Sequence, residues 1–327
     1  MNLSVDYLGL KLNSPLVVGS SSLSMKIENL KKMENAGAGA VVLRSLFEEE
    51  ITLEYEHLLK TASESDPHMD YYDVKIKNDN LEKYLQYIKE AKSQINIPII
   101  ASVNCTSSHE WTYFGKKIEE AGADAIELNM FIMPSDFEKN CEEIENIYFE
   151  IIDKVKQETN LPIAVKLSYY FADLAAFVKK VSQKVEGVIL FNRFFHTDFD
   201  IENFKIIPSN VLSRSSDVAI SLRWISIMAG RVNGTLIAST GVHDGSSVIK
   251  EILAGADATQ VVSALYKHGI EYLEDMKMDL TSWMERHNYN SIEEFRGKMS
   301  QANSPNPASV ERMQFMKYFE SKKYDFE

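Results

Sequence analysis

The run PIAVKLS, residues 162–168, places a lysine inside an apolar segment. The ammonium of Lys166 would lose its hydration there unless an anion or a reacting carbonyl receives it. Two chemical roles fit this setting: a permanent cation that stabilises negative charge on a bound cofactor, or an amine that forms a Schiff base. A lysine whose head reaches past the end of its segment to water is the purely structural alternative.

Other polar residues recur at the ends of apolar runs. Asn129 follows AIEL, and Asn192 follows VILF. Asparagine and serine commonly end strands because their side chains bond nearby backbone groups. The convergence of these polar ends favours a binding site, which we expect to contain Ser20, Ser21, Arg44, Ser45, Asn104, Cys105, Asn129, Lys166, Asn192, Ser239, Thr240, Gly241 and Ser263.

A glycine-containing loop precedes a helical run near the end of the series. STGVHDGSS is followed by VIKEILAGA, so Gly241 and Gly245 lie before a helix, and Ser263 with Ala264 follows the next apolar run. Such loops cradle a phosphate through backbone N–H groups. The pattern predicts a phosphorylated ligand and no particular reaction, because unrelated barrel enzymes share it.

The apolar runs themselves have the pattern of buried strands. They are short, continuous and rich in β-branched residues, as in a parallel sheet covered on both faces; they occupy 14–22, 40–45, 97–104, 125–130, 161–168, 186–193, 234–241 and 258–263. Three of them follow a Gly-Ala turn typical of a helix C-cap, in NAGAGA, EAGADA and LAGADA. Segments between most of the runs have helical spacing, for example IENLKKMENA and WTYFGKKIEEA.

This alternation predicts an α/β fold of the (β/α)8 TIM-barrel type, since about eight βα units close a parallel barrel of about 250 residues. The long gaps 46–96 and 194–234 should hold insertions over the carboxyl-terminal face of the strands. An open doubly wound sheet is the alternative, but its G-x-G-x-x-G loop after the first strand is absent. We predict one catalytic domain over 1–300 and a C-terminal surface extension over 301–327.

Composition limits the class of partner. The 327 residues carry a formal net charge of −13, which argues against nucleic acid because a phosphate-binding surface needs excess positive charge. Only two cysteines are present, so a disulfide framework and a cysteine-ligated metal are not expected, and a reducing cytoplasm fits. No apolar run approaches the ~20 residues of a membrane span. We expect a cytoplasmic protein with a small-molecule substrate, no metal and no membrane contact.

Several of these segments together resemble one known family. The stretch IPIIASVNCTSSHEWTYFGKKIEEAGADAIELN, then LPIAVKLS, VILFNR, LIASTGVHDGSSVIKEILAGADATQVVSALYKHG and YNSIEEFRGKM, is similar to the dihydroorotate dehydrogenase family and to the related domain of dihydropyrimidine dehydrogenase. The resemblance extends from SPLVVGSSS to about residue 300. It implies an FMN over the top of the barrel that takes a hydride from a dihydropyrimidine, and it favours a homodimer.

The resemblance also implies roles for individual residues. Lys166 matches the lysine at the flavin N1 and C2 carbonyl edge, and Asn129 and Asn192 match asparagines that face the pyrimidine, a role that suits an amide. Arg44 stands where a lysine is common and could contact either ligand. The implied cofactor-binding set is Ser20, Ser21, Arg44, Asn104, Lys166, Ser215, Ser216, Ser239, Thr240, Gly241, Ser263 and Ala264, with Ser215 and Ser216 in place of a Gly-Gly pair.

The sequence departs from the family where the substrate should react. The family's fourth strand ends in Asn-Leu-Ser-Cys-Pro or a close variant, whose Cys, or a Ser elsewhere, removes the substrate proton. Here Asn129 is followed by MFIMP, without a thiol or hydroxyl, and the substrate segment reads SESDPHMDYY. Cys105 and Ser135 are the nearest replacement candidates; a lone cysteine is more often buried as a small hydrophobe, and Ser135 could cap the next helix.

Three functions remain open from the sequence. The first is an FMN-dependent dehydrogenase acting on dihydroorotate or a related molecule. The second is an FMN-binding relative that has lost dehydrogenation, and the third is a Schiff-base lyase or aldolase that uses Lys166. No cysteine-rich segment could hold iron–sulfur clusters, so the electron acceptor should be a soluble molecule or a separate subunit.

Overall fold

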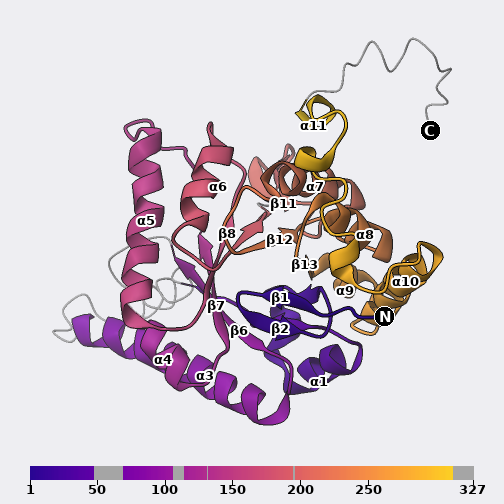
Figure 1. Ribbon diagram of the computed structural model, residues 1–327. Helices are drawn as coiled ribbons and strands as arrows, with labels where there is room; N and C mark the ends of the chain where they lie inside the picture. The colour runs from indigo at the N-terminus through magenta and orange to yellow at the C-terminus, as the bar shows by residue number, and fades with distance from the viewer. Residues whose placement is uncertain (48–68, 106–113, 131, 194–195, 312–327) are drawn as a thin grey trace.

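A closed parallel barrel forms the centre of the molecule (Figure 1). The computed structural model describes residues 1–47, 69–105, 114–130, 132–193 and 196–311. The barrel strands are β3 (Leu16–Val18), β4 (Ala40–Val42), β6 (Ile99–Cys105), β7 (Ala125–Met130), β8 (Ile163–Leu167), β9 (Gly187–Leu190), β12 (Thr235–Ser239) and β13 (Ala258–Val261). Closure comes from parallel pairing of β13 with β3 and of β4 with β6. The predicted TIM barrel is confirmed, and each predicted run overlaps one barrel strand.

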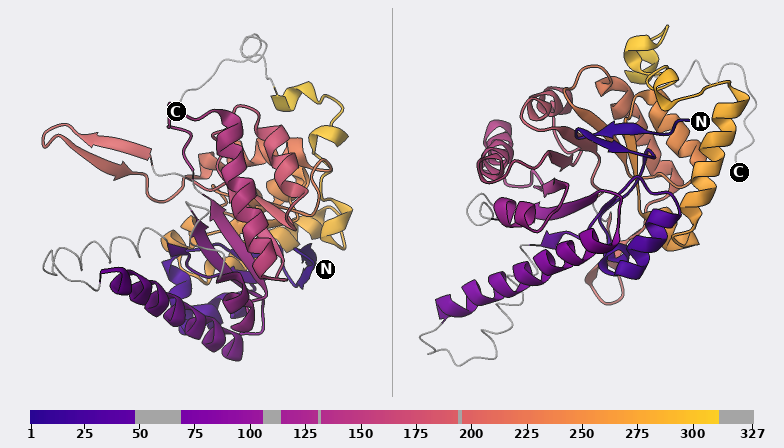
Figure 2. Two further views of the ribbon diagram at one scale, coloured as in Figure 1. Left: turned by 90° about the vertical axis from the view of Figure 1, so that its left-hand side faces the viewer. Right: turned by 60° about the horizontal axis from the view of Figure 1, so that its bottom comes forward.

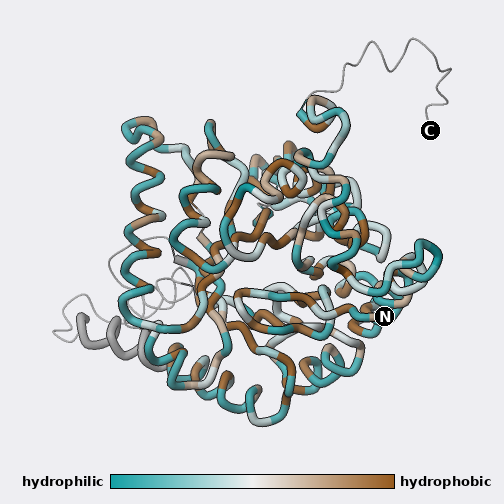
Figure 3. The backbone as a smooth tube through the Cα atoms, in the orientation of Figure 1, coloured by the Kyte–Doolittle hydropathy of each residue, from teal (hydrophilic) through white to brown (hydrophobic). Residues whose placement is uncertain are grey.

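Helices surround these strands because each βα unit must bury its apolar helix face against the sheet. The helices are α1 (Ile27–Asn35), α3 (Met69–Gln94), α4 (Phe114–Glu120), α5 (Cys141–Glu158), α6 (Leu174–Ser182), α7 (Val218–Met228), α8 (Gly245–Ala254), α9 (Ser263–His268), α10 (Tyr272–Arg286) and α11 (Ala308–Glu311). Short 3₁₀ turns are η1 (Ser22–Met25), η2 (Ser215–Asp217), η3 (Ile292–Glu294) and η4 (Gln301–Asn303). Figure 3 shows apolar residues concentrated along the strands, whereas the helices alternate between polar and apolar.

The three Gly-Ala turns end helices as expected. Gly37, Gly122 and Gly255 have φ of 90°, 93° and 122°, a left-handed conformation that glycine adopts without a Cβ clash. Their backbone N–H groups donate to the last turns of α1, α4 and α8. These caps direct the chain into β4, β7 and β13.

A short antiparallel ribbon covers the amino-terminal end of the barrel. It consists of β1 (Val5–Tyr7) and β2 (Leu10–Leu12), and the backbone N–H of Leu8 donates to Oγ1 of Thr235 at 2.8 Å. Tyr7 is fully buried. The ribbon thus covers this end of the barrel, which leaves the carboxyl-terminal end as the open one.

A second ribbon projects away from the body, as the left view of Figure 2 shows. It pairs β10 (His196–Asp200) with β11 (Lys205–Ser209) in antiparallel register and lies within the predicted insertion 194–234. In the other predicted insertion, 46–96, the structure describes β5 (Leu46–Phe47), which pairs with β6, and α3; residues 48–68 lie outside the described part.

The start of α5 corrects one expectation. Its N-cap is Asn140, whose side chain accepts from the N–H of Glu143 at 3.0 Å while the Glu143 carboxylate accepts from the N–H of Asn140 at 2.7 Å. Ser135 therefore does not cap this helix. Asparagine is as good an N-cap as serine, and the acidic residue three positions later completes the capping box.

After residue 300, the structure describes the segment 301–311, which contains η4 and α11. The boundary between a catalytic domain and a C-terminal extension at residue 300 stays a prediction.

Candidate active site

A cavity of about 650 Å³ opens at the carboxyl-terminal ends of the barrel strands. Residues predicted from strand ends form much of its wall: Ser20, Ser21, Arg44, Lys166, Asn192, Ser239, Thr240, Gly241 and Ser263. Wall residues that the sequence analysis did not single out are Ser22, Phe191, Arg193, Val211, Leu212, Ser213, Val242, Gln260, Val262 and Tyr266. Eight parallel strands bring these positions together because all of their carboxyl ends point to one side.

Lys166 is held at the floor of this cavity by two side chains. Its Nζ donates to Oε1 of Gln260 at 2.8 Å and lies 3.5 Å from Oε1 of Glu127, while Nε2 of Gln260 donates to Oε2 of Glu127 at 2.6 Å. Glu127 is fully buried and Lys166 is 8% exposed. The structural alternative, a lysine head that reaches past the strand to water, is therefore wrong, because the ammonium binds partners inside the barrel.

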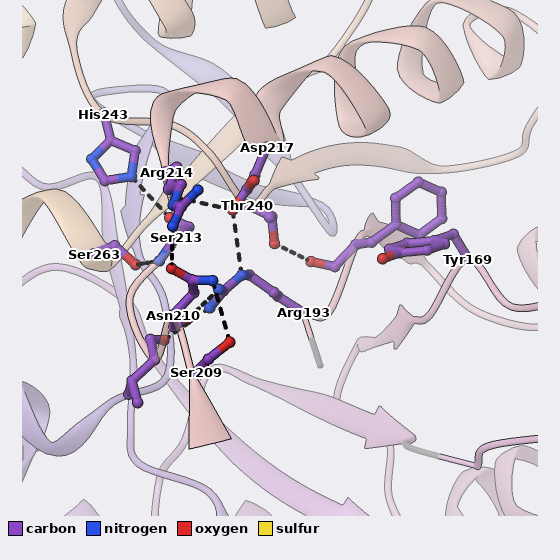
Figure 4. A network of polar contacts seen from close by, with 12 residues as sticks. Tyr169, Arg193, Ser209, Asn210, Ser213, Arg214, Asp217, Thr240, His243 and Ser263 are labelled. Atoms are coloured by element: carbon purple, nitrogen blue, oxygen red, sulfur yellow. Dashed lines mark hydrogen bonds and ion pairs between the residues drawn. The ribbon is translucent and has the colours of Figure 1, made fainter. Parts of the chain in front are cut away.

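The cavity wall is cationic although the whole chain is acidic. Arg44, Lys166 and Arg193 contribute side chains to it, and the described residues of the wall include no carboxylate. Arg193 is fixed: its Nη1 donates to the Val211 carbonyl at 2.8 Å, and its Nε lies 3.4 Å from Asp217 (Figure 4). Such a wall favours anionic ligands. Arg193 directly follows Asn192 at a strand end, which was the available sequence signal.

The loop after β12 adopts the left-handed conformation at two successive residues. Thr240 has φ of 84° and Gly241 has φ of 78°. The Thr240 hydroxyl donates to the Phe191 carbonyl at 2.9 Å (Figure 4), a bond that offsets part of the backbone strain of a β-branched residue there. A Cβ on Gly241 would lie 2.0 Å from the backbone nitrogen of Val218. Gly245 lies elsewhere: it begins α8, where a Cβ would meet Asp279 of α10 at 2.2 Å.

Ser213 connects this end of the cavity to two further elements (Figure 4). Its backbone N–H donates to Oγ of Ser263 at 3.0 Å, its Oγ lies 2.9 Å from Nε2 of His243, and Nζ of Lys267 donates to its carbonyl at 2.9 Å. Burial, and then the nearby Lys267 charge, lower the pKa of His243. The imidazole is thus neutral near pH 7 and acts as a hydrogen-bond partner that holds the loop.

Serine hydroxyls form a chain below the opposite wall. Ser20 Oγ lies 3.1 Å from Ser45 Oγ, which lies 2.7 Å from Ser102 Oγ, and the Ser45 N–H donates to Ser20 Oγ at 3.0 Å. Ser21, beside Ser20, has a buried Oγ without a hydrogen-bond partner among the described residues. Buried polar groups are normally paired, so this hydroxyl on a wall residue marks a polar position whose partner is missing from the described chain.

The predicted asparagines, one on β7 and one just after β9, are hydrogen-bonded to each other across the end of β8. Nδ2 of Asn192 donates to Oδ1 of Asn129 at 2.8 Å, and the Asn192 N–H donates to the Leu167 carbonyl at 2.7 Å. Asn129 is adjacent in register to Asn104 and to Lys166. Asn192 contributes directly to the cavity wall, whereas Asn129 lies one hydrogen bond behind it. The Asn104 side chain is buried, and its Oδ1 has no partner in the described chain.

Other predicted site residues lie away from the cavity. Ser215 and Ser216 are exposed in η2, and the wall at this place is formed by Val211, Leu212 and Ser213 instead. Ala264 is fully buried in α9. Ser135 is exposed outside the wall, and both the side chain of Cys105 and the segment 63–68 of SESDPHMDYY lie outside the described residues.

The described part of the apolar run after Asn129 does not line the cavity. Met130 is fully buried and belongs to the core, whereas Met133 is 43% exposed. Residue 131 is not described. The segment thus passes from the barrel core to the surface within a few residues, and its described part contributes no side chain to the cavity wall.

A closed parallel barrel with a cation-lined cavity at its carboxyl-terminal end defines a TIM-barrel protein whose cavity is suited to an anionic ligand. The model of the family described as dihydroorotate dehydrogenase matches residues 2–284. The chain therefore belongs to the dihydroorotate dehydrogenase family, whose members are oxidoreductases that act on CH–CH bonds. No helix in the described ranges is long and apolar enough to cross a membrane.

Curated relatives match over nearly their whole length. The protein named dihydroorotate dehydrogenase B (NAD(+)), catalytic subunit, from Thermoplasma volcanium is 27% identical over 317 residues, covering 90% of this chain and 98% of the relative. The proteins of the same name from Thermoplasma acidophilum and Pyrococcus abyssi are 24% and 25% identical, each covering 90% of this chain and 98% of the relative.

Proposed function

We propose that this chain is an FMN-dependent dehydrogenase that oxidises a dihydropyrimidine, with dihydroorotate as the first substrate to test. The observation that carries the proposal is the buried Lys166 ammonium at the floor of a cavity whose described wall has cations and no carboxylate. Both a reduced flavin and the carboxylate of dihydroorotate are anionic. A fixed cation in a partly dehydrated cavity stabilises such charge far better than water-exposed lysines do.

The residues present fit FMN. Ser21, one of the wall residues, has a buried hydroxyl that lacks a hydrogen-bond partner among the described residues. Ser239, Thr240, Gly241 and Ser263 would hold the phosphate, and Lys166 would contact the pyrimidine edge of the flavin. Bound FMN supplies the hydride acceptor, and the chain's own contribution is to orient it and to stabilise its reduced form.

The Schiff-base alternative is supported less well. A Schiff-base amine must become neutral and free to attack, whereas the Lys166 nitrogen lies 3.5 Å from the fully buried Glu127 carboxylate and 2.8 Å from Gln260. A buried carboxylate needs a cation nearby, so this pairing favours a lysine that stays charged. An FMN-binding relative without dehydrogenation remains the second candidate, favoured by the absence of a family base after Asn129.

Electron transfer out of the flavin requires an acceptor. Relatives are named as catalytic subunits of an NAD(+)-dependent enzyme. We propose a separate subunit that receives the electrons, because this chain has two cysteines, too few for the four ligands of an iron–sulfur cluster.

Cofactor content tests the proposal. Purified protein should be yellow, its spectrum should be that of a flavin, and the released cofactor should be FMN. FMN-free chain should bind added FMN, and the complex should bind orotate with a change in flavin absorbance. Borohydride trapping of a carbonyl compound on Lys166, with no flavin bound, would instead establish the Schiff-base alternative.

The asparagine pair gives a prediction for substrate recognition. Asn129→Ala and Asn192→Ala should each weaken orotate binding by about 1–3 kcal/mol, because Asn192→Ala leaves a ring group unpaired and Asn129→Ala removes the acceptor that orients Asn192. FMN affinity should be unchanged. Titration of the flavin spectrum with orotate measures both variants, and Asn203→Ala, in the exposed hairpin turn, is the control. Orotate affinity equal to that of the unmodified chain in both variants would exclude this pocket as a pyrimidine site.

The projecting ribbon gives a prediction for assembly as a homodimer. Phe199 and Ile206 are paired across β10 and β11, share one face, and are 65% and 75% exposed, with Phe204 at the turn 94% exposed. A lone two-stranded ribbon is marginal in water, so a covering partner would stabilise it. We propose a second copy of this chain as that partner, in line with the homodimer that the family resemblance favours.

Sedimentation of the purified chain should therefore show a dimer. The double variant Phe199→Asp with Ile206→Asp should be a monomer, because a dimer would have to bury the new carboxylates without a cationic partner. His196→Asp, on the polar face of the same ribbon, is the matched control and should leave the dimer intact. A monomeric starting protein, or a double variant that stays dimeric, would remove this ribbon as the interface.

A further inference from the structure

Two buried side chains meet beneath Lys166 inside the barrel. Glu127 comes from β7 and Gln260 from β13, strands that are not neighbours in the barrel, yet their side chains are joined by a 2.6 Å hydrogen bond. Both are polar residues on buried barrel strands, with 0% and 2% of their surface exposed. Burying a carboxylate and an amide here costs stability unless every polar atom is paired, so we expect this pair to have a role beyond packing.

The amide of Gln260 fixes the position of the ammonium. Oε1 accepts from Lys166, and Nε2 donates to Glu127. Only a side chain with both a donor and an acceptor can serve the two ions at once. The Lys166 nitrogen is therefore directed by Gln260 rather than collapsed onto the carboxylate, from which it stays 3.5 Å away.

The other groups near Glu127 are neutral hydroxyls. Burial, and then the Glu127 charge, raise the pKa of Tyr7, which packs from the amino-terminal ribbon. Burial also raises the pKa of Tyr84, with Glu127 as a smaller contributor. Among the described ion pairs, Lys166 is the partner of Glu127. The Glu127 carboxylate thus offsets part of the Lys166 charge from inside the barrel, and the opposite side of the ammonium faces the cavity.

We propose that Glu127 and Gln260 are positioning residues that set how strongly Lys166 stabilises the anionic, reduced flavin relative to the oxidised one. This inference rests on the proposed function. Glu127 weakens the positive potential at the cavity floor, and Gln260 keeps the ammonium at the floor. The two residues therefore act in opposite directions on the same quantity, the ratio of the dissociation constants of oxidised and reduced FMN.

The test uses the FMN-free full chain and anaerobic titration with oxidised and with chemically reduced FMN. Glu127→Gln removes the opposing charge, so the ratio should shift about tenfold toward tighter binding of reduced FMN. Gln260→Leu frees the ammonium to move onto Glu127, so the ratio should shift about tenfold the other way. A tenfold change corresponds to about 30 mV in the two-electron potential of the bound flavin, which gives an independent readout.

A merely structural role predicts a different result, in which both variants weaken oxidised and reduced FMN equally and leave the ratio unchanged. Thr259→Val is the matched control, because Thr259 is the buried neighbour of Gln260 on β13 and its hydroxyl has no partner in the described chain. Shifts of opposite sign, with the control unchanged, support the proposal. Unchanged ratios, or shifts of the same sign, overturn it.

Two further outcomes separate this inference from the proposed function. If the unmodified chain binds no FMN in either state, the proposed function fails and the inference fails with it. If FMN binds but the ratios do not move, only the inference fails. Gln260→Leu changes no charge, so it keeps the test decisive if Glu127→Gln lowers the stability too far for titration.

Discussion

Lys166→Met should lower the free energy of unfolding of the FMN-free chain by about 3–5 kcal/mol, because it leaves the fully buried Glu127 carboxylate without its cation. Methionine keeps a similar length and apolar character, so the packing of the stem is largely retained. The loss should be visible in urea unfolding as a lower midpoint with the same slope. It should also weaken binding of reduced FMN more than of oxidised FMN.

A double variant separates the unpaired charge from lost packing. Lys166→Met with Glu127→Gln removes both charges and leaves an amide that can still bond Gln260, so it should recover much of the lost stability. Lys184→Met is the comparison for an ordinary ion pair, since Lys184 lies 2.7 Å from Asp153 with side chains 38% and 50% exposed. It should cost at most about 1 kcal/mol. A Lys166→Met loss no larger than that would show that the buried pair contributes little.

Local sequence signals were sufficient to predict the barrel. Continuous β-branched runs mark strands buried on both faces, and the glycines at 37, 122 and 255 mark helix ends by their left-handed conformation. Once the strands are known, parallel topology places their carboxyl ends on one side, so residues such as Ser20 and Ser263 could be assigned to a common cavity without knowledge of their contacts.

Contacts across the barrel could not be predicted in the same way. Glu127 and Gln260 are 133 positions apart, and nothing local indicates that their side chains meet. Glu127 and Gln260 are also polar residues inside mainly apolar runs, which is the pattern that indicated Lys166. The pattern therefore marks all three residues as candidates for the site. The prediction that Ser215 and Ser216 line the cavity was wrong for another reason. After Asn192 the chain leaves the barrel to form the β10–β11 ribbon, and where it returns, Val211 to Ser213 line the cavity instead.

Proton removal is where this chain differs most from the family pattern, and the structure sharpens the difference. The described wall of the cavity contains no thiol, imidazole or carboxylate. Glu127 lies beneath the floor and is engaged by Gln260 and Lys166, and Ser135 is exposed with its N–H donating to the Met133 carbonyl at 2.8 Å. Neither is placed to take a proton from a substrate in the cavity.

Flavin reduction by dihydroorotate should therefore be slow at neutral pH, below the rate of an enzyme with a placed general base by the ~10²–10⁴-fold that such a base contributes. Because the described wall supplies no thiol, imidazole or carboxylate, we expect hydroxide to take the proton, so the rate should rise with pH and reach no plateau near neutrality. Anaerobic stopped-flow mixing of the FMN-loaded chain with dihydroorotate across pH measures this, and Cys105→Ala and Ser135→Ala should each change the rate little. Rapid reduction at neutral pH would contradict the prediction, and loss of that rapid phase in one of the two variants would identify its side chain as the replacement base.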